Sequence, residues 1–205
     1  METFRNYFYK VFTLMTRIVL IFEIINDFRS KDTYCLSVGL AAILLTFLPK
    51  LVEKVLKKNN ELISFLFMLF IFLASYLGTL KRFYAIFPWW DSAVHFLSGI
   101  ILGLIAFCAL KNVDIFKNTE SIKFRIFALI SIISFATLCG VLWEIYEFTM
   151  DNILGTDMQV VELTGVADTM GDLIADFFGG TIIGIYGFTA FKNKTNSPSK
   201  YTKNF

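Results

Sequence analysis

The second half of the chain holds the residues whose types and spacing best suit chemistry. Between Ile126 and Phe191 there is no Lys or Arg. The carboxylates of this stretch are Glu144, Glu147, Asp151, Asp157, Glu162, Asp168, Asp172 and Asp176. An uncompensated carboxylate is costly in apolar surroundings, so such groups pair, take up a proton or bind a cation. The imbalance therefore predicts a site for a cation or for protons.

Helical spacing arranges most of these carboxylates, with one upstream pair, into three stripes. Residues three or four apart lie on the same face of a helix. The stripes are Asp91 with His95, Glu144 with Glu147, and Asp168 with Asp172 and Asp176. The remaining acidic residues, which are Asp151, Asp157 and Glu162, are expected in a solvated outer loop.

A divalent metal ion would supply the positive charge that these stripes lack. Oxygen ligands together with one imidazole suit Mg²⁺, Mn²⁺ or Zn²⁺, whereas Ca²⁺ prefers oxygen ligands alone. The expected ligands are Asp91, His95, Asp168, Asp172 and Asp176, and the expected catalytic base is Glu144 or Glu147. Protonated carboxylates that relay protons, and a purely structural cluster, are the alternatives.

The composition indicates that these stripes lie on membrane helices. Of the 205 residues, 56% are hydrophobic, against roughly 45–50% in soluble domains. Six segments have the length of about 20 residues that crosses a bilayer; they lie at about 8–26, 33–50, 62–80, 91–110, 124–147 and 168–191. We therefore predict an all-α protein with one six-helix transmembrane domain over residues 1–191 and a polar cytoplasmic tail at 192–205.

The basic residues predict the orientation. With both termini in the cytoplasm, 14 Lys and Arg fall on the cytoplasmic side and 4 on the opposite side, a positive-inside bias. The three stripes then meet at one membrane level, near the outer face. Because Asp176 follows Asp168 by eight residues, it lies about 12 Å deeper. We expect a polar funnel that opens to the outer surface.

Several classes of protein and of site are excluded. The net charge of +2 does not provide the basic face that a nucleic-acid partner requires. The three Cys residues lie in apolar runs without disulfide or zinc spacing. The first apolar run contains Arg17 and Glu23 and no cleavage site, so we expect it to be retained. Membrane lipids are the expected partners, and the sequence does not indicate an oligomeric state.

Three motifs in the last three spans carry a family resemblance. They are Trp90-Asp91-Ser-Ala-Val-His95-Phe-Leu-Ser-Gly99, Trp143-Glu144-Ile-Tyr-Glu147 and Asp168-Thr-Met-Gly-Asp172-Leu-Ile-Ala-Asp176-Phe-Phe-Gly179. In type and order they resemble the YjdF-like family of bacterial inner-membrane proteins. The resemblance implies a multi-pass protein of the bacterial cytoplasmic (inner) membrane with its motif positions at the seven stripe residues. It implies no particular reaction.

Three functions fit these expectations. The first is a metal-dependent hydrolase of a lipid or lipid-linked phosphoester at the outer leaflet, with Lys81 and Arg82 near the substrate phosphate. The second is a proton- or cation-coupled transporter, which would need polar groups that continue toward the cytoplasm. The third is a structural membrane protein in which a metal ion links the helices.

Overall fold

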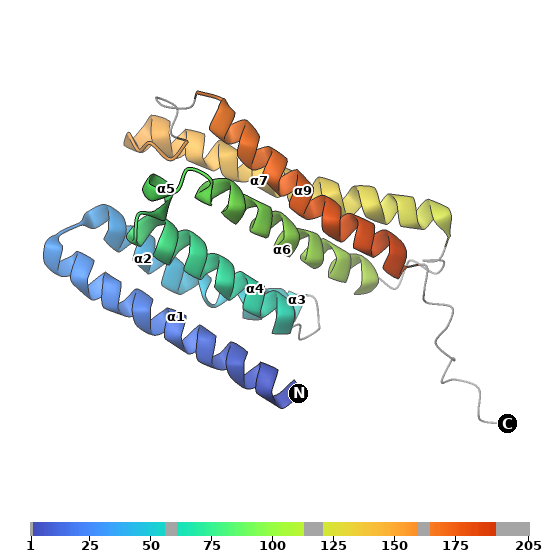
Figure 1. Ribbon diagram of the computed structural model, residues 1–205, viewed down its shortest axis with the longest axis horizontal. Coiled ribbons are helices and arrows are strands. Elements are labelled where there is room, and N and C mark those ends of the chain that lie inside the picture. The colour runs from blue at the N-terminus through green and yellow to red at the C-terminus, as the bar shows by residue number, and fades with distance from the viewer. Residues whose placement is uncertain (1, 56–60, 113–120, 160–164, 192–205) are drawn as a thin grey trace. The chain divides into compact units, whose positions relative to one another are not determined.

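Every regular element in the described part of the chain is a helix (Figure 1). The computed structural model describes residues 2–55, 61–112, 121–159 and 165–191. In chain order the elements are α1 (Glu2–Ser30), α2 (Thr33–Leu45), α3 (Leu48–Val55), α4 (Glu61–Ile71), the π-helix η1 (Phe72–Leu80), α5 (Phe83–Ile86), α6 (Trp90–Asn112), α7 (Ile122–Leu154) and α9 (Ala167–Ala190). The all-α prediction is confirmed. The predicted tail 192–205 and Glu162 lie outside the described residues.

Five helical segments in the described residues are long and apolar enough to cross a membrane. They are Thr33–Lys54, Glu61–Leu80, Trp90–Asn112, Ile122–Leu154 and Ala167–Ala190, and they match the second to sixth predicted spans. Large apolar side chains on these helices are exposed, for example Leu44, Ile130 and Ile182, as expected where lipid rather than water is the neighbour. The protein is therefore a multi-pass helical membrane protein.

Helix α1 covers the first predicted span but is not among these five segments. It carries Lys10, Arg17 and Glu23 within its apolar run, and this charge sets it apart from the other five. The count of six spans and the cytoplasmic position of both termini stay predictions.

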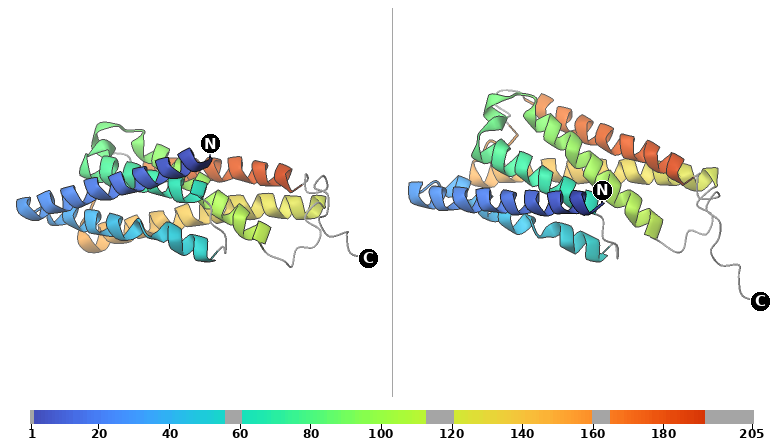
Figure 2. Two further views of the ribbon diagram at one scale, coloured as in Figure 1. Left: turned by 90° about the horizontal axis from the view of Figure 1, so that it is seen from below. Right: turned by 60° about the horizontal axis from the view of Figure 1, so that its bottom comes forward.

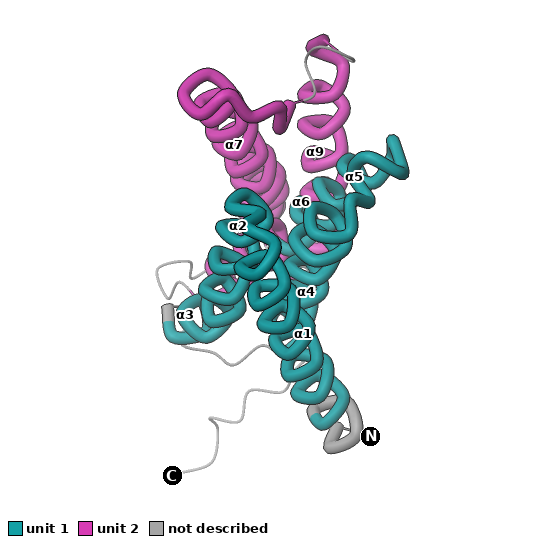
Figure 3. Tube along the Cα trace, turned by 90° about the vertical axis from the view of Figure 1, so that its left-hand side faces the viewer, with its two compact units in different colours: residues 1–101 teal, residues 102–205 magenta. Residues whose placement is uncertain are grey.

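Two compact units make up the chain, residues 1–101 and 102–205 (Figure 3). The boundary falls inside α6, which is one continuous helix. The predicted single transmembrane domain over residues 1–191 is not tested by this division.

In the first unit, α1, α2 and the α4–η1 segment pack around a small apolar core. Its fully buried members are Leu20, Ala42, Met68 and Ile71. The second predicted span is broken into α2 and α3, because Pro49 lacks the N–H of a helical turn and its ring clashes with the preceding turn. The break lies at Thr46 and Phe47.

The α4–η1 segment anchors the start of α6 within the same unit. The π-helical turns end where the N–H of Lys81 donates to the carbonyl oxygen of Tyr76, at 2.9 Å. The indole Nε1 of Trp90 donates to the carbonyl oxygen of Leu73, at 3.2 Å, and the Trp90 ring packs edge-on against Phe83. The first residue of α6 is therefore fixed just before Asp91.

In the second unit, α7 and α9 form an antiparallel hairpin of two long helices (Figures 1 and 2). Close approach of their backbones depends on glycine. A Cβ atom added to Gly180 would lie 2.7 Å from Cβ of Ala136, and one added to Gly140 would overlap Oδ2 of Asp176. These two contacts fix which residues of α7 and α9 lie opposite each other. The hairpin continues beyond them to Glu144 on α7 and to the start of α9.

Candidate metal centre

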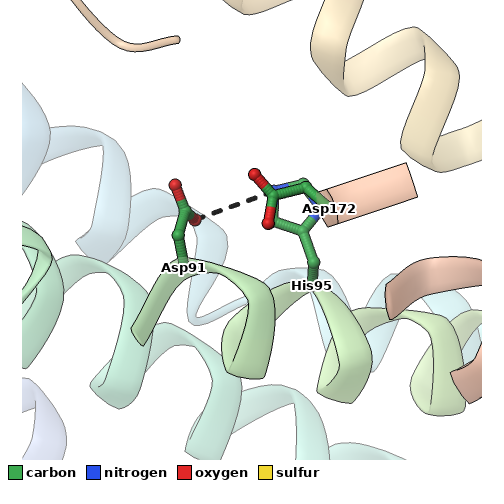
Figure 4. A group of neighbouring side chains, drawn as sticks. All are labelled: Asp91, His95 and Asp172. Atoms are coloured by element: carbon green, nitrogen blue, oxygen red, sulfur yellow. Dashed lines mark ion pairs between the residues drawn. The ribbon is translucent and has the colours of Figure 1, made fainter. Parts of the chain in front are cut away.

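Asp91 and His95 occupy successive turns at the start of α6, as their spacing predicted (Figure 4). His95 Nε2 lies 3.7 Å from Asp91 Oδ1, which is an ion pair when the imidazole is protonated. The His95 side chain is 6% exposed and that of Asp91 is 24% exposed. An imidazole and a carboxylate thus face the same side of one helix, with the imidazole shielded from solvent.

The predicted carboxylates of the second unit are buried, with one exception. The exposed fractions are 5% for Glu144, 7% for Glu147, 2% for Asp172 and 0% for Asp176, whereas Asp168 is half-buried. The hairpin register places Glu144 level with Asp172, because each lies one turn beyond the Gly140–Asp176 contact. The structure therefore gathers the second and third stripes at one end of the α7–α9 hairpin.

Glu144 is held by a residue that sequence reasoning missed. The Gln159 side chain is buried, and its Nε2 lies 3.3 Å from Glu144 Oε2 and 3.2 Å from Thr169 Oγ1. Because a carboxylate only accepts hydrogen bonds, the amide donates to it. Gln159 follows the end of α7 and belongs to no helical stripe, so no spacing pattern could have found it.

Asp151 explains why Gln159 lies there. Its carboxylate accepts hydrogen bonds from Thr156 Oγ1 at 2.6 Å, from the N–H of Met158 at 2.7 Å and from the N–H of Gln159 at 3.0 Å. Asp151 was expected in the outer loop, and that expectation is wrong: α7 continues to Leu154 and ends at Gly155, in the left-handed conformation with φ 67°. Between Glu147, where the predicted span ends, and Gly155 the sequence contains no glycine or proline that would end the helix earlier.

A hydrogen bond from a neighbouring aromatic side chain fixes Glu147. Nε1 of Trp143, one turn earlier, donates to Glu147 Oε1 at 2.9 Å. Trp143 and Tyr146 stack at a tilt with ring centroids 5.2 Å apart, and both side chains are largely exposed. A buried carboxylate is therefore hydrogen-bonded to an aromatic side chain on the outward surface of the helix.

Lys81 and Arg82, the two cations that the sequence predicts at the outer face, differ in their surroundings. Lys81 Nζ lies 2.7 Å from Glu23 Oε1, and this hydrogen bond raises the pKa of Lys81 above its ordinary value of 10.5. Arg82 adopts a left-handed backbone conformation, with φ 60°, at the turn before α5. Lys81 is thus already engaged by a carboxylate of its own unit.

Comparison with known proteins agrees with the resemblance found in the motifs. A protein of Thermotoga maritima described as "Uncharacterized protein" is 33% identical over 109 residues, which are 53% of this chain and 53% of the relative. The chain thus spans about half the length of that relative. No solved structure matches. The family described as "Predicted membrane protein (DUF2238)" matches residues 8–193, and the chain belongs to this family of membrane proteins.

Proposed function

We propose that this protein is a metal-dependent hydrolase of a lipid or lipid-linked phosphoester at the outer face of the bacterial inner membrane. The ligands expected from the sequence, among them Asp91 and His95 on α6 and Asp172 on α9, would hold a divalent cation through carboxylate oxygens and an imidazole nitrogen. Asp168 and Asp176, one turn to either side of Asp172, remain candidate ligands. The observation that carries the proposal is the burial of Glu144, Glu147, Asp172 and Asp176 in a stretch that contains no basic residue. Buried carboxylates need a compensating charge.

Packing inside the second unit aligns the second half of α6 with α9. The second half of α6 lies against α9: a Cβ added to Gly103 would lie 2.9 Å from Cβ of Ile183, and one added to Gly187 would lie 3.3 Å from Cδ2 of Phe107. In both pairs the residue on α9 follows the residue on α6 by 80 positions. The two helices therefore run parallel in a constant register.

The chemistry divides among the residues as follows. A bound divalent ion would polarise a phosphoryl oxygen and lower the pKa of a water molecule. Glu144, level with Asp172 and hydrogen-bonded to Gln159, would accept the proton of that water as general base. The exposed pair Trp143 and Tyr146 would lie beside the apolar part of a substrate that arrives through the bilayer.

The packing between α7 and the part of α9 that follows Asp176 favours a hydrolase over a transporter. The buried residues of α9 beyond Asp176 are Gly179, Gly180, Ile183, Gly184 and Gly187, and their buried counterparts on α7 are Phe124, Ala128, Ile132 and Ala136. A conduit would need polar groups along this interface, and these residues are apolar. A site closed at its inner end suits a reaction rather than conduction.

The test begins with metal content. The full chain is purified in detergent, and its bound metals are measured by elemental analysis for wild type, Asp172→Asn and the control Asp157→Asn, which removes the same charge from an exposed loop residue. We expect stoichiometric Mg²⁺, Mn²⁺ or Zn²⁺ in wild type and control and its loss in Asp172→Asn. No divalent metal in wild type, or metal retained in Asp172→Asn, overturns the proposed site.

Activity is then measured as phosphate release from phosphatidic acid in mixed micelles, with and without chelator. We expect phosphate release only when the metal is bound. The Glu144→Gln variant should release no phosphate although its metal content is unchanged. Metal that raises the melting temperature without any phosphate release would indicate a structural ion and refute the hydrolase.

A further inference from the structure

A two-residue break at Thr46 and Phe47 separates helix α3 from α2, and a contact inside the first unit holds this break in place. α2 ends at Leu45 with Thr46 as its C-cap, and Pro49 prevents the helix from continuing unbroken. The guanidinium of Arg17 on α1 binds this break: Nε donates to Thr46 Oγ1 and Nη2 donates to the Thr46 carbonyl oxygen, each at 3.1 Å. The same group lies over the Phe47 ring, 4.4 Å from its centroid. α3 therefore starts from a fixed point.

The two sides of α3 differ in charge. Lys50, Leu51 and Lys54 are exposed, and Leu51 follows the exposed Phe47 by four residues. At 100° per residue Lys50, Leu51 and Lys54 fall within one stripe of α3, and Phe47 lies in the break just before the helix. The one acidic residue of α3, Glu53, points to α4, where Ser64 Oγ donates to its Oε1 at 2.6 Å. The exposed face thus presents two ammonium groups and two apolar side chains with no carboxylate among them.

This combination fits the headgroup region of a bilayer. Lysine side chains at a helix surface attract anionic headgroups, while neighbouring apolar side chains enter the acyl boundary. We propose that the face of α3 formed by Phe47, Lys50, Leu51 and Lys54 binds an anionic phospholipid, with the two ammonium groups on the headgroup phosphate and with Phe47 and Leu51 against the chains. This surface is separate from the carboxylate cluster, so the proposal does not rest on the proposed function.

The test measures lipid binding directly. The full chain in detergent is titrated with phosphatidylglycerol or with zwitterionic phosphatidylcholine, and bound lipid is counted by native mass spectrometry. The variant is Lys50→Gln/Lys54→Gln. The control is Lys10→Gln/Lys111→Gln, which removes the same charge from two exposed lysines outside α3. Melting temperatures establish that both variants are folded.

We expect wild type to prefer phosphatidylglycerol and the α3 variant to bind it roughly 30-fold more weakly, since each lysine near an anionic surface contributes a factor of about five. The control should stay within about twofold of wild type, and phosphatidylcholine binding should not change. Equal binding of both lipids by wild type, unchanged binding by the α3 variant, or an equal loss in the control overturns the proposal.

Discussion

Replacement of Gly140 by alanine tests the packing that holds the carboxylate cluster. The new Cβ would overlap Oδ2 of Asp176 and would lie 2.9 Å from its Cγ and 3.2 Å from its Cβ. Asp176 is 0% exposed, so its carboxyl group cannot turn into solvent to make room. The two helices or the Asp176 side chain must shift.

Two opposing effects determine the magnitude. An alanine in a helix is favoured over glycine by about 1 kcal/mol. Overpacking costs about 1–3 kcal/mol, and contacts shorter than 3.0 Å with a fully buried group place Gly140→Ala near the upper end. The net destabilisation is therefore about 2 kcal/mol, a fall in melting temperature of roughly 4–8 °C for a chain of this size.

The assay is thermal unfolding in detergent, with a control and a compensating variant. Gly187→Ala is the control, because its Cβ would meet mainly Cδ1 of Ile132, at 2.8 Å. This atom is the end of a side chain that can shift by rotation about one bond, so we expect a smaller change. In the Asp176→Ala background the two shortest contacts of Gly140→Ala disappear, so there the substitution should be neutral or stabilising. An equal fall in both backgrounds, or no fall in wild type, would refute the reasoning.

Substitutions at three further positions probe other contacts. Arg17→Lys should destabilise the protein by about 1–3 kcal/mol, because an ammonium cannot make both hydrogen bonds of the guanidinium to Thr46. Thermal unfolding checks this, with Arg29→Lys at an exposed site on α1 as the control. Equal destabilisation by both substitutions would contradict the prediction. The hydrogen bond from the N–H of Cys35 holds the pKa of Asp32 below the ordinary value of 3.8. The Asp32 carboxylate therefore stabilises the start of α2 above pH 3.8, and this stabilisation is lost as the pH falls through the lowered pKa. The effect is small because solvent screens this partly exposed group. In Asp32→Asn the melting temperature should fall slightly less at low pH than in wild type. An identical dependence of the melting temperature on pH in the two proteins would argue against the prediction. Gln159→Leu should cost about 1–3 kcal/mol by removing the donor to buried Glu144, and Gln159→Glu should cost more because two carboxylates then meet; unfolding measurements that give the reverse order would count against the assigned contact.

Most of the helical framework could be predicted from the sequence, because membrane helices depend on length and hydropathy. The spans expected at 62–80 and 91–110 coincide closely with Glu61–Leu80 and Trp90–Asn112. The break at Thr46 and the π-helical turns of η1 were not expected. Pro49 is the local cause of the break, although hydropathy does not register it. The π-helical turns receive a hydrogen bond from Trp90 at the carbonyl oxygen of Leu73, a contact that hydropathy does not record.

For the candidate site, the sequence by itself determined which residues share a helix face. Spacing within one helix follows from its local geometry, so the pair Asp91–His95 and the stripe that contains Asp172 needed no structure. Tertiary structure alone decided that Gly140 seats Asp176 and that Gln159 reaches Glu144. These contacts depend on the register between two helices and on how a loop folds back at a helix end. Such pairings join residues 15 or more positions apart, where backbone periodicity carries no information and packing determines the partner.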